Sequence, residues 1–216
     1  MTRMLSLHSL ITIFLFHILK IFKIKIKKMD KNEKNVPLDP VYSKTVLEML
    51  TVANEYCLFL EKVESYDRQD IMGFLSKICP LIYIKASLLP AIELTDEEAA
   101  EHFVTEEEWE GVFNSLHQKF GEDDLYYFID PHELSHTDAV KGSLAENFTD
   151  IYQDLKDFVL LYQKPRKVSM EFAVYECKRL FETRYGFRLV RAHSVLHYLL
   201  NKEGDKGELQ DLLEIL

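Results

Sequence analysis

A shortage of glycine and proline is the feature that most constrains the fold of this chain. Among 216 residues there are only 7 glycines and 6 prolines. Sheet proteins need a turn roughly every 8–12 residues, and such turns are usually built with these two residue types. The shortage therefore favours long helices. At roughly 100–200 residues per domain, the chain has room for one domain and an appendage.

Apolar residues recur with helical spacing from residue 39 onwards, and capping signals mark several boundaries. Asp39 precedes Pro40, Thr105 and Glu108 form a capping box, and Gly186 is expected to end a helix. The predicted fold class is all-α, a helical bundle of about six helices. We expect helices over about residues 39–66, 67–90, 105–120, 143–163, 169–185 and 187–201.

The second predicted helix is apolar almost all round after Cys79, so we expect it to be the central helix. Pro80 lacks a backbone donor and is expected to kink this helix. The segments 93–104 and 122–142 carry acidic and turn residues, and we expect both to be loops.

Residues 1–28 differ in composition from the rest of the chain. They contain six basic residues and no acidic residue, whereas residues 29–216 carry a net charge of −16. We therefore predict an N-terminal extension over 1–28, a linker over 29–38, a single all-α domain over 39–203 and a tail over 204–216.

Three interpretations of the N-terminal extension remain open. A signal peptide would place its basic residues before the apolar run, whereas here they follow it, and no cleavage site is recognisable. A membrane anchor would use residues 4–28, but the uncharged run 4–19 spans only about 24 Å as a helix. The third interpretation, which we favour, is a misassigned start, with translation beginning at Met29. It predicts a cytoplasmic protein, and the anchor predicts one held on the inner membrane with its domain in the cytoplasm.

The composition and motifs exclude several functions. The net charge of −10 disfavours binding to nucleic acid. Cys57, Cys79 and Cys177 are an odd number, which argues against a disulfide framework, and we expect them to be buried. Because the chain lacks GxxxxGK[ST], GxGxxG, HExxH and CxxC motifs, we predict no cofactor and no metal.

Polar residues that interrupt apolar stripes are the candidate site residues. Lys85 lies in the apolar row of the second predicted helix, and Asn54 and Glu61 interrupt the row of the first. Glu48 is expected to point away from that row, so Lys85 would need a partner from another helix. A lysine in such a position pairs, loses its proton or reaches a cavity.

The fourth predicted helix carries an acidic ridge at i, i+4 and i+8, formed by Glu146, Asp150 and Asp154. Such a ridge can bind metal in a bundle, but the Glu-x-x-His motif of di-iron proteins is missing. The sixth predicted helix carries His193 and His197 at i, i+4, a weak chelating pair.

These residues define one candidate polar cluster, which is either a buried ion-pair network or a small site for an anion or a metal. Arg184 completes it, at the end of the apolar stripe of the fifth predicted helix. The primary candidates are Lys85, Asp150, Asp154, Arg184 and His193, and the secondary candidates are Asn54, Glu61, Glu146 and His197.

Three segments resemble a known family: residues 143–158, 79–90 and 184–187, with the helix that follows the last. The strongest part is Asp-Ile-Tyr-Gln-Asp-Leu-Lys-Asp, residues 150–157. Together they resemble an uncharacterised bacterial, Bacteroidetes-type, all-helical family, domain of unknown function 5063. The resemblance covers about residues 41–200. It implies no activity, and it implies that residues 1–28 lie outside the domain.

This sequence departs from the family pattern at two places. Glu146-Asn147 stands where relatives often carry paired aspartates, and Tyr185 stands where they carry tryptophan. The first departure weakens the case for a metal site.

We therefore expect an interaction or scaffold module without catalysis, whose partner is another protein or a second copy of the chain. One alternative is a small metal-dependent hydrolase that uses Asp150, Asp154 and His193. The other is a form of the same module anchored to the membrane through its N-terminal extension.

Overall fold

The computed structural model describes residues 39–94, 101–129 and 139–214, with side chains described as far as residue 202. All of these residues belong to the compact unit Asp39–Leu216. The predictions for residues 1–38 lie outside the described residues. None of the described helices combines the length and the apolar character that crossing a bilayer requires.

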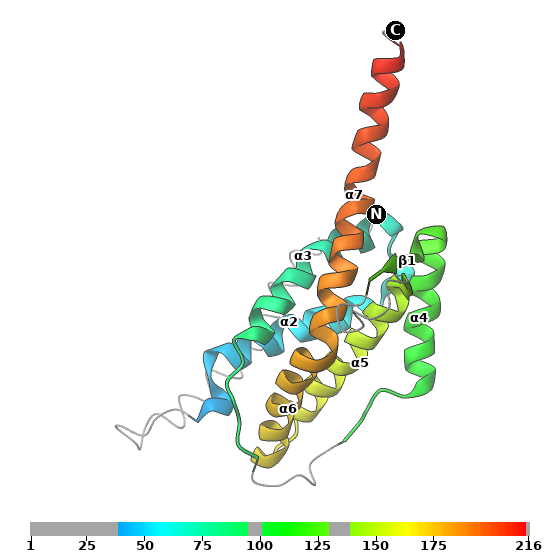
Figure 1. Cartoon of the computed structure of the whole chain (residues 1–216). Coiled ribbons are helices and arrows are strands. Elements are labelled where there is room, and N and C mark those ends of the chain that lie inside the picture. Colours follow the sequence, from blue (N-terminus) through cyan, green and yellow to red (C-terminus); the bar gives the residue numbers. More distant parts are fainter. Residues whose placement is uncertain (1–38, 95–100, 130–138, 215–216) are drawn as a thin grey trace, which may run out of the picture. The chain divides into compact units, whose positions relative to one another are not determined.

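The prediction of an all-α fold is confirmed, because helices make up most of the described residues (Figure 1). Short 3₁₀ turns lie at Pro40–Tyr42, Val63–Ser65 and Gly121–Asp124. The α-helices are α2 (Lys44–Leu60), α3 (Arg68–Ser87), α4 (Glu106–Phe120), α5 (Leu144–Tyr162), α6 (Lys167–Leu180) and α7 (Gly186–Glu214).

Side-chain caps explain where several helices begin. The hydroxyl groups of Ser43 and Ser143 accept backbone hydrogen bonds at the starts of α2 and α5. Thr105 and Glu108 form the predicted capping box of α4. Asp39, by contrast, caps only a 3₁₀ turn, so the first long helix begins at Lys44, later than the expected start at about residue 39, and ends at Leu60.

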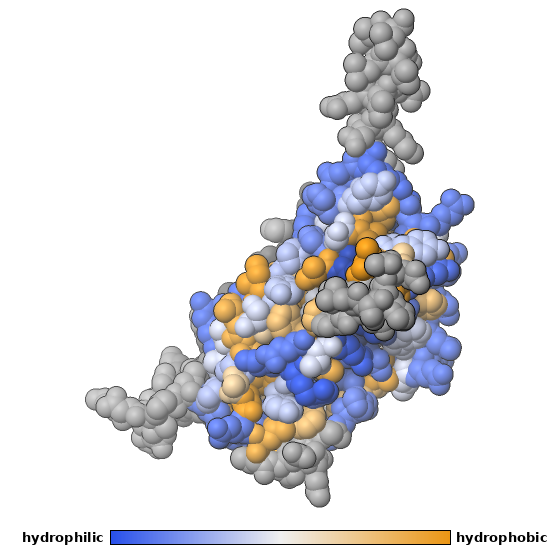
Figure 2. Space-filling model, viewed as in Figure 1, coloured by the Kyte–Doolittle hydropathy of each residue, from blue (hydrophilic) through white to orange (hydrophobic). Residues whose placement is uncertain are grey.

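The central helix is α5, which packs against α2, α4, α6 and α7. The prediction that the second helix, α3, is central is wrong. Several apolar residues beyond Cys79 remain exposed, including Ile84 at 53% and Leu88 at 55%. Figure 2 shows apolar side chains among polar ones over this side of α3. An unbroken apolar run cannot by itself reveal that one face of a helix stays in water. The helix continues through Pro80 as one element, and the expected kink stays a prediction.

The segment predicted as a loop over 122–142 contains a β-hairpin. Strand β1 (Leu125–Phe128) pairs antiparallel with β2 (Val140–Ser143). Four-residue strands are too short to show a clear alternating pattern in the sequence. Gly142 leaves room for the buried ring of Tyr126, because a Cβ atom would lie 2.8 Å from its Cζ and the ring would have to shift.

The expected helix break at Gly186 is also wrong. A π-helical segment, η4 (Phe181–Tyr185), connects α6 directly to α7. Gly186 has a helical φ of −60°, and its N–H donates to the carbonyl of Phe181. A Cβ atom on Gly186 would lie 2.4 Å from that oxygen. Glycine is needed for this close approach in the π segment, and it does not terminate the helix here.

Replacing Gly186 with alanine should therefore destabilise the domain. We expect Gly186→Ala to lower the free energy of unfolding by about 1–3 kcal/mol, because backbone must move to admit the methyl group. Gly111→Ala is the matched control, since Gly111 lies inside α4 with nothing within 4 Å of a Cβ. It should raise stability by about 0.5–1 kcal/mol. Urea denaturation of both variants checks this, and equal effects at the two positions would contradict it.

Candidate functional site

Lys85 forms no ion pair with the other primary candidates among the described residues. Its Nζ atom donates to Oε2 of Glu48 at 2.9 Å, between α3 and α2. The prediction that Glu48 cannot serve Lys85 is therefore wrong, because two long side chains can meet even when their helix positions diverge. The Lys85 side chain keeps 24% of its surface exposed, so this is a partly solvated ion pair.

Two other primary candidates form a direct pair. Arg184 binds the carboxylate of Asp154 with two hydrogen bonds, at 3.1 Å through Nε and 2.6 Å through Nη2. One turn along α5, Asp150 accepts from Arg188 and, at 3.0 Å, from Nε1 of Trp109. The acidic ridge of α5 thus faces arginines on η4 and α7.

The two histidines do not join these pairs. His193 is half-buried, and its Nδ1 atom has no hydrogen-bond partner among the described residues. His197 is exposed. Over residues 39–94, 101–129 and 139–202, no group of three metal-ligating side chains is placed to hold an ion.

The secondary candidates are dispersed. Asn54 is half-buried on α2, and Glu61 accepts hydrogen bonds from Lys156 and, at 3.5 Å, from Tyr152. Glu146 is exposed in the first turn of α5, where it lines a cavity.

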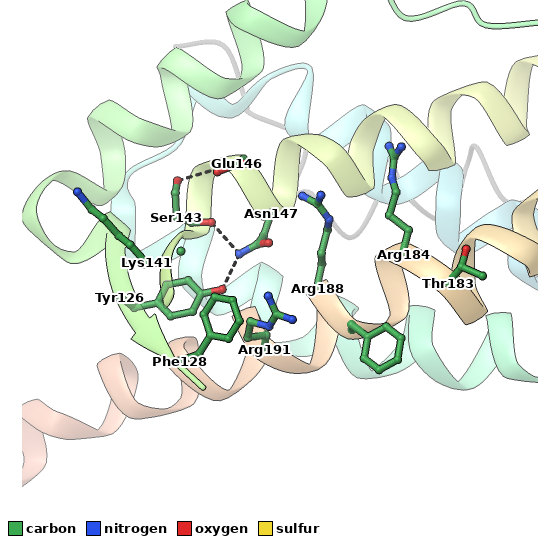
Figure 3. Close-up of a pocket in the computed structure, with 12 residues that line it drawn as sticks. Tyr126, Phe128, Lys141, Ser143, Glu146, Asn147, Thr183, Arg184, Arg188 and Arg191 are labelled. Carbon is green, nitrogen blue, oxygen red and sulfur yellow. Dashed lines mark hydrogen bonds between the residues drawn. The ribbon is translucent and has the colours of Figure 1, made fainter. Parts of the chain in front are cut away.

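This cavity has a volume of about 320 Å³ and lies between the start of α5, the hairpin and the segment from η4 to α7 (Figure 3). Four cationic side chains line it, together with one carboxylate, that of Glu146. Figure 3 shows the arginines projecting from η4 and α7. The cations are Lys141, Arg184, Arg188 and Arg191.

A buried carboxylate anchors the wall of the cavity formed by the start of α5. Asp124 is 1% exposed, and it accepts hydrogen bonds from the N–H of Ala145 at 2.7 Å and from the hydroxyl of Ser143. These bonds tie the hairpin to the first turn of α5, whose N–H groups would otherwise lack acceptors. Asn147 donates to the hydroxyl of Tyr126 at 2.6 Å, which holds the ring against the cavity.

Two of the four cations that line the cavity lack carboxylate partners among the described residues. The guanidinium of Arg191 stacks 3.7 Å from the ring centroid of Phe128. In the described part of the chain, neither Arg191 nor the exposed Lys141 forms an ion pair. Arg184 and Arg188, in contrast, are neutralised by the carboxylates behind them.

Asp154 has an unusual protonation equilibrium. Burial raises the pKa of its carboxyl to about 7, and the nearby charge of Asp150 acts in the same direction. Arg184 lowers this pKa but does not offset burial. The Asp154 side chain is 5% exposed and that of Arg184 40%, so solvent screens the guanidinium more than the carboxylate.

Sequence reasoning missed Lys141, Arg188, Arg191 and the anchor Asp124. One signal was available, because arginines at 184, 188 and 191 follow the i, i+4, i+7 spacing of one helix face. The expected break at Gly186 separated Arg184 from the other two and concealed this ridge. No local pattern connects Asp124 or Lys141 to α7, because only the tertiary fold brings them together.

The fold and cavity define a helical protein with a small arginine-lined pocket beside a β-hairpin. Its sequence matches the family model described as "Domain of unknown function (DUF5063)" over residues 40–202. The chain belongs to this family, which confirms the resemblance found in the sequence.

A crystal structure of a protein from Bacteroides fragilis, a structural genomics target, is similar to this chain at 35% sequence identity. The match covers 74% of this chain and 95% of the other, with a TM-score of 0.67. No curated protein matches the chain.

The anchoring role of Asp124 can be tested against its neighbour. Asp124→Asn should lower the free energy of unfolding by about 1–3 kcal/mol, because an amide nitrogen replaces an oxygen acceptor in a buried network. Asp123→Asn is the control, since Asp123 forms partly exposed ion pairs with Arg68 and Lys202. Its cost should stay below about 1 kcal/mol. Chemical denaturation distinguishes the two, and equal costs would argue against the anchor.

Proposed function

We propose that this protein is a non-catalytic interaction module that binds an anionic group of its partner in the arginine-lined pocket. The observation that carries the proposal is Arg191, which lines the cavity together with Arg184 and Arg188 and has no carboxylate partner among the described residues. Like charges gathered in one cavity repel each other, and an anion between them relieves that repulsion.

The charge of the whole chain makes this cavity stand out. Residues 29–216 carry a net charge of −16, so cations are in the minority. Four of them nevertheless line one cavity, close to the positive end of the α5 dipole at Ser143. Arginine suits such a site, because its planar fork matches the oxygens of phosphate or carboxylate groups.

The size of the pocket favours a single anionic group over a large cofactor. Its volume of about 320 Å³ lies at the lower end of the range for ligand pockets, which is roughly 300–1,000 Å³. A phosphate or carboxylate on another protein, or on a second copy of this chain, fits this description. Nucleic acid does not, because the acidic surface would repel a long phosphate backbone.

The carboxylates of the alternative metal-dependent hydrolase already have partners. Asp150 and Asp154 are bound by Arg188 and Arg184, which would have to withdraw before a cation could be coordinated. An anion-binding module therefore needs no change in these two ion pairs, whereas a metal-dependent hydrolase would require both to break.

We propose the cytoplasm as the compartment. Cys57, Cys79 and Cys177 are buried free thiols, which is typical of proteins from reducing compartments. The membrane-anchored alternative depends on residues 4–28, which lie outside the described residues.

Sulfate is a suitable probe of the pocket, because it presents the tetrahedral oxygens of a phosphate group. We expect isothermal titration calorimetry to show that Arg191→Gln weakens sulfate binding by roughly tenfold or more, since a charge-assisted hydrogen bond is lost. Lys141→Gln should weaken binding in the same direction.

The matched control is Arg166→Gln, which removes the same charge from an exposed position outside the pocket. It should change the affinity by less than about twofold, because solvent screens a distant surface charge. The proposal fails if the wild-type protein does not bind sulfate, or if Arg166→Gln weakens binding as much as Arg191→Gln.

A further inference from the structure

We infer that the Asp154–Arg184 pair couples anion binding in the pocket to protonation of Asp154. While the carboxyl group is ionised, it holds the guanidinium of Arg184. Once it is neutral, that guanidinium is free to donate to the bound anion. This inference rests on the proposed function and concerns the regulation of the same site.

The position of Arg184 supports a shared role. Its side chain lines both the arginine-lined pocket and a second cavity, also of about 320 Å³, which Asp154 lines as well. Two of its nitrogens bind Asp154, yet 40% of the side chain remains exposed. Arg184 thus lies between a buried carboxylate, which it binds, and an open pocket, where its guanidinium can reach a bound anion.

The charge balance of the site fits a switch. The pocket and the two carboxylates behind it contain four cations and three carboxylates, which leaves one net positive charge. Protonation of Asp154 raises this to two, which matches a dianion. Each added charge favours the anion strongly, because the carboxylate lies behind the pocket and away from solvent.

The proton equilibrium of Asp154 falls in the range where such a switch would operate. Burial raises the pKa of its carboxyl to about 7, so that both forms are populated near neutral pH. The anion and the ionised carboxylate compete for one guanidinium. Sulfate binding should therefore strengthen as pH falls through this value and weaken as pH rises above it.

Other charged or titratable groups face Asp154 or share its cavity, and the test must separate them. His102 is the histidine among them, and it forms an ion pair with Asp157. Glu101 and His102 precede α4, and Asp150 and Asp157 lie on α5. The groups on α6 are Glu176, Cys177 and Arg179. The groups on η4 and α7 are Arg184, Tyr185 and Arg188.

The test measures sulfate affinity of the full chain by calorimetry at about pH 6 and about pH 8, at constant ionic strength. Sulfate keeps both of its charges over this range, so a change in affinity reports on the protein. We expect the wild-type protein to bind roughly tenfold more tightly at the lower pH. Asp154→Asn should bind equally at both, with an affinity close to that of the wild type at the lower pH.

Two variants serve as matched controls. Asp150→Asn frees Arg188 but leaves Asp154 in place, so it should retain the pH dependence. His102→Asn should retain it as well. Arg184→Gln removes the cation that Asp154 controls, so it should bind sulfate more weakly and without pH dependence. It also tests the inference independently if Asp154→Asn does not fold, as judged by circular dichroism.

The outcomes separate this inference from the proposed function. Sulfate binding by the wild-type protein with equal affinity at both pH values would overturn the coupling and leave the pocket intact. A pH dependence that persists in Asp154→Asn or Arg184→Gln, or that disappears in His102→Asn, would assign the proton to another group and also overturn the coupling. An absence of sulfate binding at both pH values would overturn the proposed function itself.

Discussion

The burial of charge on the central helix is the constraint on which this structure depends. α5 packs against four other helices, yet it carries Asp150 and Asp154 towards its partners. A buried carboxylate is costly unless it is paired. Arg184 and Arg188 supply the pairs, and in doing so they set how α7 lies along α5. One turn further, Glu146 and Arg191 do not pair with each other, and both line the pocket that Arg184 and Arg188 also line.

The π-helical segment allows the arginines to reach these partners. η4 joins α6 to α7 without a loop, and it carries Arg184. The close contact between Gly186 and the carbonyl of Phe181 permits this geometry. π-helical segments are rare in proteins, and those that occur are often found at functional sites. Here the segment places Arg184 between two cavities, where a single guanidinium contacts Asp154 and lines the pocket.

The sequence predicted the fold class and several helix starts correctly, but it predicted few of the residues that form the site. The helical class, the Thr105 cap and the Ser143 start of α5 followed from local spacing and composition, and the family followed from the resemblance of three segments. Of the predicted polar cluster, the structure pairs only Asp154 with Arg184 directly. Lys85 pairs with Glu48, although helix geometry predicts that Glu48 points away from it. Helical spacing gives the direction of a Cβ atom, but long flexible side chains extend well beyond it.

The sequence by itself determined that this chain forms long helices, since few residues in it can make turns and its apolar residues follow a helical period. It also determined the acidic ridge, because i, i+4 spacing places side chains on one face of any helix. Only the tertiary structure decided what faces that ridge. The arginines of α7 and the hairpin residues come from separate segments, and their convergence depends on long-range packing that no local pattern encodes. The pocket is therefore a property of the packed domain, because its cations meet only when α5, α7 and the hairpin are assembled.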